Sequence, residues 1–257
     1  MIFDTHAHYD DAQFDADREE LLLSLSDHHI GKVVNIGTNV STSQRSVELA
    51  EKYPFVFAAV GIHPSDTREM AQGDLRRIAD LAKADRVVAI GEIGLDYYWD
   101  KEEQVRSRQK ECLIEQLEIA RKAGLPVVIH SRDAAKDTLD IMKEYGRDLG
   151  GVIHCYSYSV EIAREYVKMG YFLGIGGVLT YKNSKTIKEV AAQIPLEHLV
   201  LETDCPYLTP APHRGKRNCS LYLPYVVQAL SEIKGLPVEE VERVTWENAH
   251  RLYHLSY

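Results

Sequence analysis

The sequence lacks any apolar run long enough to cross a membrane. Its longest runs, at residues 56–62 and 87–90, fall far short of the ~18 residues that indicate a membrane span. The first residues show no basic segment followed by a long apolar one, so no secretory signal peptide is predicted. Cysteine is scarce too, because four in 257 residues do not form a disulfide framework, and free thiols are expected. We therefore expect a cytoplasmic protein that does not bind membranes.

The sequence also lacks an excess of basic residues. It has 30 Lys and Arg against 39 Asp and Glu, which gives a formal net charge of −9 at pH 7. This balance argues against a protein that coats nucleic acid through bulk electrostatics, which usually requires a basic face. It does not exclude an enzyme that acts on nucleic acid, because two bound divalent cations would add positive charge at the active site itself.

No repeat, low-complexity tract or linker interrupts the chain, and one pattern recurs along it. Helical spacing of apolar residues marks 17–26, 41–52, 104–123, 159–169 and 238–253. Short apolar or β-branched runs, read as strands, begin near Ile2, Val33, Phe55, Arg86, Pro126, Gly151, Tyr171 and His198. Eight strand–helix units predict a parallel sheet with helical crossovers, and eight strands close a barrel. We expect an α/β protein, a (β/α)8 TIM barrel with a single domain over residues 1–257; an open doubly wound sheet is the alternative.

Side chains that can bind metal occur where the predicted strands end. Barrel enzymes place their catalytic groups at this end of the strands. A lone His after a strand is more often structural, but such residues on successive strands predict one shared site. In order along the chain they are His6 and His8 at strand one, His63 after strand three, Glu92 at the end of strand four, His130 at strand five, His154 at strand six and Asp204 at strand eight.

The positions of these residues suggest their roles. His6 and His8 are two apart on an extended strand, so they point to the same side and can reach one metal ion. The carboxylate of Glu92 would be costly to bury unless it is paired or ligates a metal, and its two oxygens can bridge two cations. We interpret Asp204 as a metal ligand and general base. Glu202, on the same face, either orients a ligating His or forms a buried ion pair.

The ligand types indicate the chemistry. A mixed set of imidazoles and carboxylates suits Zn, Mn, Fe, Co or Ni better than an all-oxygen Mg site. Two such ions ~3.5–4 Å apart can activate a water molecule and stabilise the leaving oxygen of a hydrolysis. The sequence therefore predicts a hydrolase with two divalent metal ions, without naming the bond that is cleaved. The expected ligands are His6, His8, Glu92, His130, His154 and Asp204.

A basic segment after the last predicted strand hints at the substrate. Residues 212–218 carry three Lys or Arg side chains in an otherwise acidic protein. Phosphate is the natural ligand of such a cluster, and Arg can hold it in a bidentate manner; a solvated basic loop is the alternative. The expected substrate-binding residues are Arg214, His63 and Lys216, and the expected catalytic residues are Glu92, Asp204 and His63.

Aromatic residues and cysteines near the predicted strand ends are harder to interpret. Strand alternation turns Cys155 and Cys205 away from the metal ligands, so we expect them to pack. Cys112 is expected in a helix core, and Cys219 is expected to be exposed. Several aromatics could either stack on nucleobases or pack the barrel rim: Tyr97, Tyr98, Trp99, Tyr156, Tyr158, Tyr181 and Tyr207.

Seven segments carry a shared set of motifs, in order over essentially the whole chain. They are Phe3-Asp4-Thr5-His6-Ala7-His8, Gly61-Ile62-His63-Pro64, Gly91-Glu92-Ile93-Gly94-Leu95-Asp96-Tyr97, Pro126-Val127-Val128-Ile129-His130-Ser131-Arg132, His154-Cys155-Tyr156-Ser157, Glu202-Thr203-Asp204-Cys205-Pro206-Tyr207-Leu208 and Arg214-Gly215-Lys216-Arg217-Asn218. Taken together, these motifs resemble those of the TatD family of metal-dependent deoxyribonucleases. After His154 the family usually has Cys-Phe-Ser-Gly, whereas this chain has Cys155-Tyr156-Ser157-Tyr158, and after Asn218 it commonly has Glu-Pro, whereas this chain has Cys219-Ser220.

The resemblance implies a (β/α)8 barrel that hydrolyses DNA, often as a 3′→5′ exonuclease. It implies one metal ion held by His6, His8 and Asp204, a second held by His130 and His154, and Glu92 shared between them. Family members are usually described as Mg-dependent, whereas the ligand chemistry favours softer ions, so Mg, Mn and Zn all stay open. The expected substrate is DNA, as single strands or 3′ ends, and a monomer is favoured.

Two other functions are compatible with the same residues. The barrel and its metals also serve ester and amide hydrolysis, because a fold does not determine its substrate; an aminoacyl-tRNA deacylase is the alternative of this class. A binding protein that retains the fold without activity is the other alternative, and the presence of every expected ligand argues against it.

Overall fold

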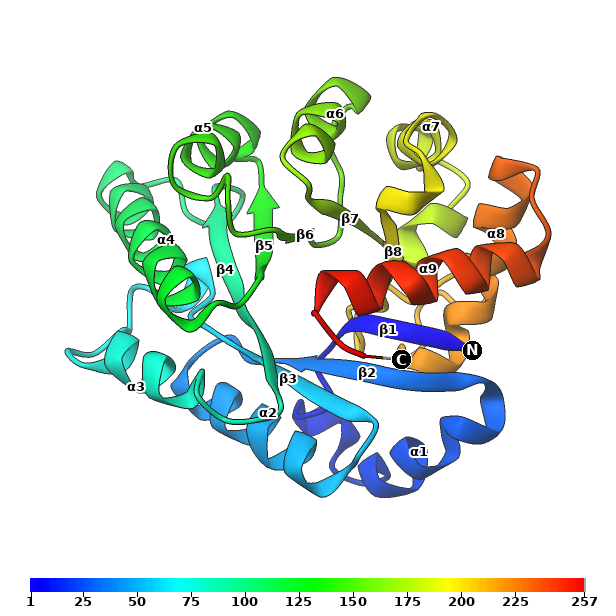
Figure 1. The fold of residues 1–257 in the computed structure, drawn as a ribbon, viewed down its shortest axis with the longest axis horizontal. Helices are drawn as coiled ribbons and strands as arrows, with labels where there is room; N and C mark the ends of the chain where they lie inside the picture. Colours follow the sequence, from blue (N-terminus) through cyan, green and yellow to red (C-terminus); the bar gives the residue numbers. More distant parts are fainter. Residues whose placement is uncertain (257) are drawn as a thin grey trace.

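The computed structural model describes residues 1–256, in which eight parallel strands alternate with helices. Each strand pairs with the next one along the chain, in the order β1 to β8. Figure 1 shows the helices arranged around the outside of the strands. The strands are β1 (Ile2–Ala7), β2 (Ile30–Ile36), β3 (Val56–Val60), β4 (Val87–Asp96), β5 (Val127–Arg132), β6 (Gly151–Ile153), β7 (Phe172–Ile175) and β8 (Leu199–Leu201).

The last strand returns to the first, so the sheet forms a nearly closed barrel. Ala7, at the end of β1, forms a parallel bridge with Cys205, which follows β8. The backbone N–H of His8 donates to the carbonyl of Cys205 at 2.9 Å, and that of Asp204 donates to the carbonyl of His6 at 2.9 Å. These contacts exclude the open doubly wound sheet and confirm the predicted (β/α)8 barrel.

All eight predicted strands are present, and the five predicted helices agree to within a few residues with observed ones. Local sequence explains their ends: Asn39 and Thr42 form a capping box at the start of α2, and Gly124 ends α4 in the left-handed conformation. The helices are α1 (Arg18–Ser24), α2 (Val40–Lys52), α3 (Asp74–Leu81), α4 (Glu103–Ala123), α5 (Ala135–Tyr145), α6 (Val160–Lys168), α7 (Lys185–Gln193), α8 (Leu223–Lys234) and α9 (Val238–Leu252).

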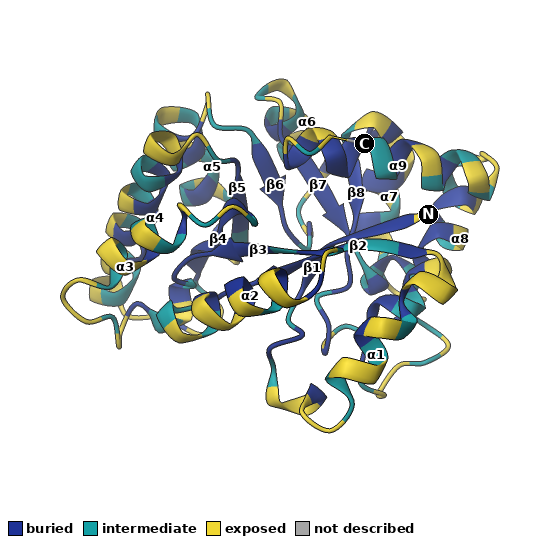
Figure 2. Ribbon diagram, turned by 60° about the horizontal axis from the view of Figure 1, so that its bottom comes forward, coloured by how far each residue is buried: buried dark blue, intermediate teal, exposed yellow. Residues whose placement is uncertain are grey.

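Two hydrophobic cores hold the barrel together. The larger one lies between the strands and the surrounding helices, and Figure 2 shows buried strands within helices that are exposed on their outer faces. The smaller one fills the barrel interior, where Phe3, Val34 and Val128 meet Leu252 and Tyr253 from the C-terminal segment. Since α9 contacts β1 and β8, it covers the end of the barrel opposite the carboxyl ends of the strands.

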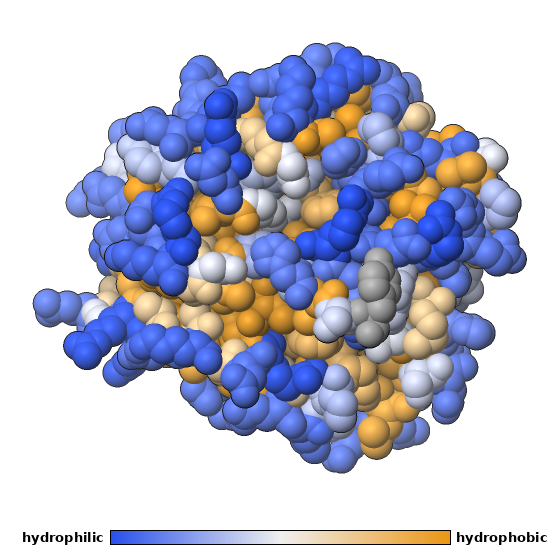
Figure 3. Space-filling view, in the orientation of Figure 1, coloured by the Kyte–Doolittle hydropathy of each residue, from blue (hydrophilic) through white to orange (hydrophobic). Residues whose placement is uncertain are grey.

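No helix in the part of the chain that the structure describes is long and apolar enough to cross a bilayer. Figure 3 shows hydrophilic side chains over much of one face, with hydrophobic residues reaching the surface in its lower half. That part of the view corresponds to the region of β2 and β3 in Figure 1.

Two local expectations differ from the structure. Cys219 was expected to be exposed but is 8% exposed, because the segment after Asn218 folds back into the larger core. Glu92 was expected to end its strand but lies within β4, which continues to Asp96 by pairing with β5. The other cysteines meet expectation: Cys112 and Cys205 are buried.

Asp4 is a buried residue that connects the two strands at the closure of the barrel. It accepts hydrogen bonds from the hydroxyl of Ser220 at 2.6 Å, from the hydroxyl and the backbone N–H of Thr203 at 2.7 and 3.0 Å, and from the backbone N–H of His6 at 3.2 Å. Burial raises the pKa of Asp4 to about 7, although the four donors favour its charged form. The sequence analysis assigned Asp4 no role.

The raised pKa of Asp4 predicts a pH dependence of stability. The folded state binds the proton more tightly than the unfolded state, so this contribution is fully present below about pH 4 and is lost as the pH rises through 7. The free energy of unfolding of the wild type should therefore fall relative to that of Asp4→Asn between pH 4 and pH 7. Urea unfolding of both proteins across this range measures the difference, and a pH-independent difference would contradict the prediction.

Candidate metal centre

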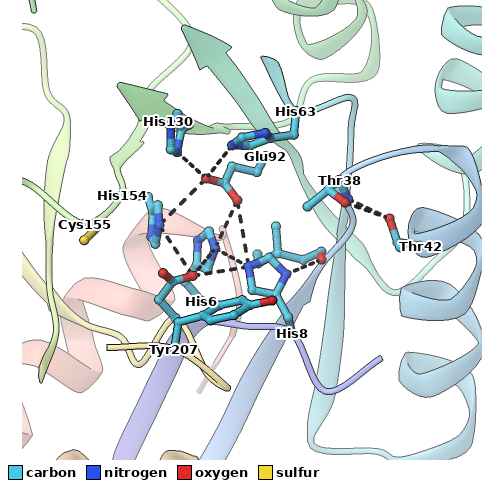
Figure 4. A network of polar contacts seen from close by, with 12 residues as sticks. His6, His8, Thr38, Thr42, His63, Glu92, His130, His154, Cys155 and Tyr207 are labelled. Atoms are coloured by element: carbon cyan, nitrogen blue, oxygen red, sulfur yellow. Dashed lines mark hydrogen bonds and ion pairs between the residues drawn. The ribbon is translucent and has the colours of Figure 1, made fainter. Parts of the chain in front are cut away.

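The barrel brings all the predicted metal ligands and His63 to the carboxyl ends of the strands. Figure 4 shows Glu92 in the middle of this group, with dashed contacts to histidines on both sides. Its side chain is 5% exposed, and five imidazoles surround its two oxygens. The nearest ring nitrogens lie at 2.8 Å for His130, 3.4 Å for His6, 3.7 Å for His63, 3.8 Å for His154 and 3.9 Å for His8.

One cluster of potential ligand atoms is formed by His6, His8 and Glu92. The Nε2 atoms of His6 and His8 lie 3.1 Å apart, as expected for two imidazoles on the same side of a strand. Asp204 adds a carboxylate oxygen, 3.3 Å from His8 Nε2 and 3.7 Å from His6 Nε2. The Nδ1 atom of His8 lies 2.9 Å from the carbonyl of Ile36 and must donate to it, which leaves Nε2 as the free ligand atom of the neutral ring.

A second cluster is formed by His63, Glu92 and His130. His130 Nδ1 lies 2.8 Å from Glu92, while its Nε2 lies 3.1 Å from the carboxylate of Asp96, so both ring nitrogens have acidic partners. His63 was expected to be a catalytic and substrate-binding residue, and in the structure its ring lies with these potential ligands. The Nε2 atom of His154 lies between the clusters, 3.8 Å from both Glu92 and Asp204.

Glu202 supports the ring of His154 from behind. Its carboxylate lies 3.1 Å from His154 Nδ1 and accepts the backbone N–H of Cys155 at 2.7 Å. The side chain needs the space beside Gly174, because a Cβ atom there would lie 2.2 Å from a Glu202 oxygen. This contact is the buried ion pair that was one of the two alternatives from the sequence, and orientation of a ligating His by Glu202 stays a prediction. The sulfur of Cys155 points away from the cluster in Figure 4, as expected.

The backbone near the centre adopts conformations that side chains rarely allow. Gly94 has a φ of +152°, and a Cβ atom there would lie 1.9 Å from the carbonyl oxygen of His130, so only glycine lets β4 approach β5 here. Asp204 has a φ of 55° and Cys155 a φ of 45°, both in the left-handed region. Such strain in non-glycine residues is concentrated at functional sites, where surrounding contacts hold it.

The charges in the centre are strongly coupled. Burial disfavours charge on His154, yet the carboxylates of Glu202 and Glu92 raise its pKa to about 10. Burial likewise opposes charge on His8, whose pKa Asp204 and Glu92 raise to about 9. For Asp204, contact with His8 and the charge of His154 outweigh burial and lower the pKa. The carboxylates therefore attract positive charge to the imidazoles that face them.

The residues fit a divalent cation. His6 Nδ1 is buried without a hydrogen-bond partner among the described residues, and burial together with the neighbouring His154 lowers the pKa of His6. A neutral imidazole is the form that binds metal. The buried carboxylate of Glu92 is costly without compensating positive charge, and nitrogen and oxygen donors in this mixture suit Zn or Mn.

A cavity of about 460 Å³ opens over the centre. Its wall includes His8, His63, Glu92, His130, His154 and Asp204. Three further carboxylates, those of Asp10, Asp11 and Asp66, line it as well, and Arg45 is the one Lys or Arg side chain of its lining. The sequence analysis missed Arg45, because an exposed arginine inside a helix carries no local signal of its position beside a strand end.

The predicted phosphate loop lies outside this cavity lining. Arg214 and Lys216 are both exposed, and the guanidinium of Arg214 lies 4.1 Å from the ring centroid of Tyr181. Arg217 is engaged elsewhere, in an ion pair with Asp17 at 2.6 Å. Contact of Arg214 and Lys216 with substrate stays a prediction.

The aromatic residues at the rim divide into two groups. Four tyrosines are buried or half-buried and bind protein partners through their hydroxyls, as expected of rim packing: Tyr97, Tyr156, Tyr158 and Tyr181. The other residues are exposed, although the hydroxyl of Tyr207 also donates to Asp11 at 3.2 Å. Tyr98, Trp99 and Tyr207 are 45%, 67% and 52% exposed. Of these, Tyr207 also lines the cavity over the centre, and Arg132 stacks on Tyr98 at 4.0 Å.

Comparison with known proteins adds an independent finding. Residues 3–254 match the family described as TatD related DNase. The chain is 44% identical to a Bacillus subtilis protein described as the uncharacterized metal-dependent hydrolase YabD, with both covered in full. It is 30% identical to an Escherichia fergusonii protein described as the 3′-5′ ssDNA/RNA exonuclease TatD, again with full coverage of both. The crystal structure of YjjV, a TatD homolog from Escherichia coli, matches with a TM-score of 0.92 and 31% identity over 99% of this chain and 98% of that chain.

The raised pKa values of His8 and His154 predict that metal binding releases protons. Both imidazoles are in their positively charged, doubly protonated form at pH 7 in the metal-free protein, and each must lose one proton to bind a cation. Metal affinity should therefore fall as the pH is lowered from 8 to 6. Calorimetric titration with Mn²⁺ or Zn²⁺ in two buffers of different ionisation enthalpy measures the release, and equal heats in both buffers would exclude it.

Glu202→Gln should weaken metal binding without removing a potential ligand. The change takes away the charge that holds the ring of His154, and loss of such an orienting carboxylate lowers metal affinity roughly 10- to 100-fold. Metal content after dialysis and the rise in Tm on adding metal give the readout. Glu189→Gln, at an exposed position on α7, is the matched control. Unchanged affinity in Glu202→Gln would refute the orienting role.

Proposed function

Because the chain belongs to the TatD family of metal-dependent hydrolases, we propose that it hydrolyses phosphodiester bonds of single-stranded DNA, removing nucleotides from the 3′ end. The observation that supports this most is the pair of ligand clusters that share Glu92 beneath an open cavity. Sites with two metal ions bridged in this way suit in-line displacement at phosphorus. The relative described as a 3′-5′ ssDNA/RNA exonuclease supports the choice of substrate.

The same residues would hold two divalent ions. In this proposal His6, His8 and Asp204 bind one ion, His130 and His154 bind the other, and Glu92 is shared. The contact of His63 with Glu92 and His130 gives it a place beside the second ion. When bound, the ions would lower the pKa of a water molecule and offset the charge that develops on the phosphate oxygens.

Asp204 is the residue we assign as general base. Its side chain is 19% exposed against 5% for Glu92, so it is the more accessible of the two carboxylates. Its lowered pKa keeps it ionised at neutral pH, and an ionised carboxylate can accept the proton of the attacking water. Its side chain also lines the cavity over the centre.

His63 is suited to donate a hydrogen bond to a phosphate oxygen. Its Nδ1 atom accepts the backbone N–H of Ser65 at 3.1 Å, so the proton of the neutral ring lies on Nε2, which faces the centre. Burial and the neighbouring His130 lower the pKa of His63 to about 3, and the ring therefore stays neutral at pH 7. We further propose that Arg214 and Lys216 contact the strand outside the cavity, and that residues 1–257 act as one domain, as a cytoplasmic monomer.

A nuclease assay with end-labelled DNA tests the proposal. Single-stranded DNA labelled at its 3′ or its 5′ end is incubated with the protein and Mg²⁺, Mn²⁺ or a chelator. A 3′→5′ exonuclease releases the 3′ label at once as a mononucleotide and shortens the 5′-labelled strand stepwise. Glu92→Gln should lower the rate on the order of 100-fold or more, because it removes the charge shared by both clusters.

The control and the opposite outcomes are defined by the structure. Glu239→Gln, at an exposed position on α9 far from the ligand clusters, should retain full activity. No nucleotide release by folded, metal-loaded protein would refute the nuclease proposal. Release of amino acid from aminoacyl-tRNA by the same preparation would then identify an ester hydrolase on this scaffold.

A further inference from the structure

Arg45 is an exposed cation that links two adjoining cavities. It lines the cavity over the candidate metal centre and also a second cavity of about 370 Å³, and Asp10 is shared in the same way. We call the second cavity the α2 groove. Its walls are Arg45, Glu48, Leu49 and Lys52 of α2 and Asp10, Asp15 and Arg18 from the segment after β1. The two shared residues make the α2 groove an extension of the cavity over the metal centre.

One face of α2 forms the path between the two cavities. Thr42 lines the cavity over the centre, Arg45 lines both, and Leu49 and Lys52 line the α2 groove. These residues are spaced three or four apart and so lie on one side of a helix. From Thr42 to Lys52 the helix rises about 15 Å. A linear ligand that leaves the metal centre along this face would therefore meet Arg45 first.

Arg45 is the cation of this path that has no protein partner. Arg18 pairs with Asp15 at 2.6 Å and Lys52 with Glu19 at 3.2 Å. Arg45, in contrast, makes no hydrogen bond or ion pair within residues 1–256, although Asp10 and Asp66 line the same cavity. A guanidinium with its donors free suits a phosphate, which it can hold with two parallel hydrogen bonds.

We propose that the α2 groove binds the single strand on the 5′ side of the scissile bond, and that Arg45 binds the first phosphate beyond the one at the metal centre. This inference rests on the proposed nuclease function and adds to it a site that selects a polynucleotide over a single diester. Carboxylates line the cavity around the proposed metal ions. Arg45 is the one Lys or Arg side chain of that lining, and it lies where the strand would leave the cavity. Arg45 is a binding residue and takes no part in the bond cleavage.

Substrates of different length distinguish the proposed role of Arg45 from a role at the scissile phosphate. A dinucleotide carries only the scissile phosphate, whereas a trinucleotide carries one more for Arg45. Steady-state kinetics on thymidine di- and trinucleotides with Mn²⁺ should show that Arg45→Gln raises KM about 10-fold for the trinucleotide, in line with loss of a charged hydrogen bond. Both kcat and the constants for the dinucleotide should stay within about twofold, since the lost contact is equal in ground and transition states.

Matched variants and a modified substrate make the test specific. Arg45→Lys keeps the charge and should retain most of the preference for the trinucleotide, and Arg76→Gln, at an exposed position on α3 outside both cavities, should behave as wild type. A trinucleotide with a neutral methylphosphonate in place of the phosphate on the 5′ side should cost the wild type the same 10-fold. The same substitution should cost Arg45→Gln nothing further, as expected for two partners of one interaction.

The outcomes distinguish this inference from the function on which it rests. An equal rise in KM for the di- and the trinucleotide would place Arg45 at the scissile phosphate and overturn the groove proposal. An unchanged KM for both substrates would also overturn it. Additive effects of Arg45→Gln and the methylphosphonate would assign the second phosphate to other residues. If the wild type releases no nucleotide from these substrates or from single-stranded DNA, the nuclease proposal itself fails, and the groove proposal fails with it.

Discussion

The buried carboxylate of Glu92 is the interaction on which the rest of the site depends. A charged group that is 5% exposed is costly to bury unless several partners stabilise it, and here five imidazoles from four strand ends do so. His6 and His8 come from the end of β1, and the other three histidines each come from a different strand end, so the cluster exists only while the strands keep their order around the barrel. The burial of Glu92, the charges of its partners and the order of the strands therefore depend on one another. A bound cation at this point would stabilise the buried carboxylate.

One end of the barrel contributes mainly to stability, and the other end holds the candidate metal centre. At the amino ends of the strands, Leu252 and Tyr253 close the interior core, and the hydroxyl of Tyr253 donates to the carbonyl of Thr5 at 2.8 Å. Within β1, Asp4 connects the strand to the segment after β8 next to His6. The potential ligands thus lie at the strand ends, while loops and α2 add further side chains to the lining of the cavity above them. Barrel enzymes commonly separate the two requirements in this way.

Binding of the proposed substrate depends on different residues from those of the metal centre. The protein is acidic as a whole, and the cavity over the centre is lined by carboxylates, so a polyanion can bind only where positive charge is concentrated. In the proposed nuclease, metal ions would supply that charge at the scissile phosphate. Elsewhere single cations matter more than net charge: Arg45 is unpaired at the cavity wall, whereas Arg217 is committed to Asp17. The position of an Arg side chain, and whether a carboxylate already pairs with it, therefore determine whether it is available to bind a phosphate.

The sequence by itself determined the strand–helix repeat and the set of potential metal ligands. Both are local signals: apolar runs mark strands, and a His or an acid directly after such a run must lie at the shared end of a parallel sheet, as for His130 and His154. Only the tertiary structure decided the closure of the sheet, the burial of Cys219, the grouping of His63 with His130 and the placement of Arg45 rather than Arg214 in the cavity wall. These depend on how loops and helices far apart in the chain pack together, and no local pattern of residues encodes such contacts.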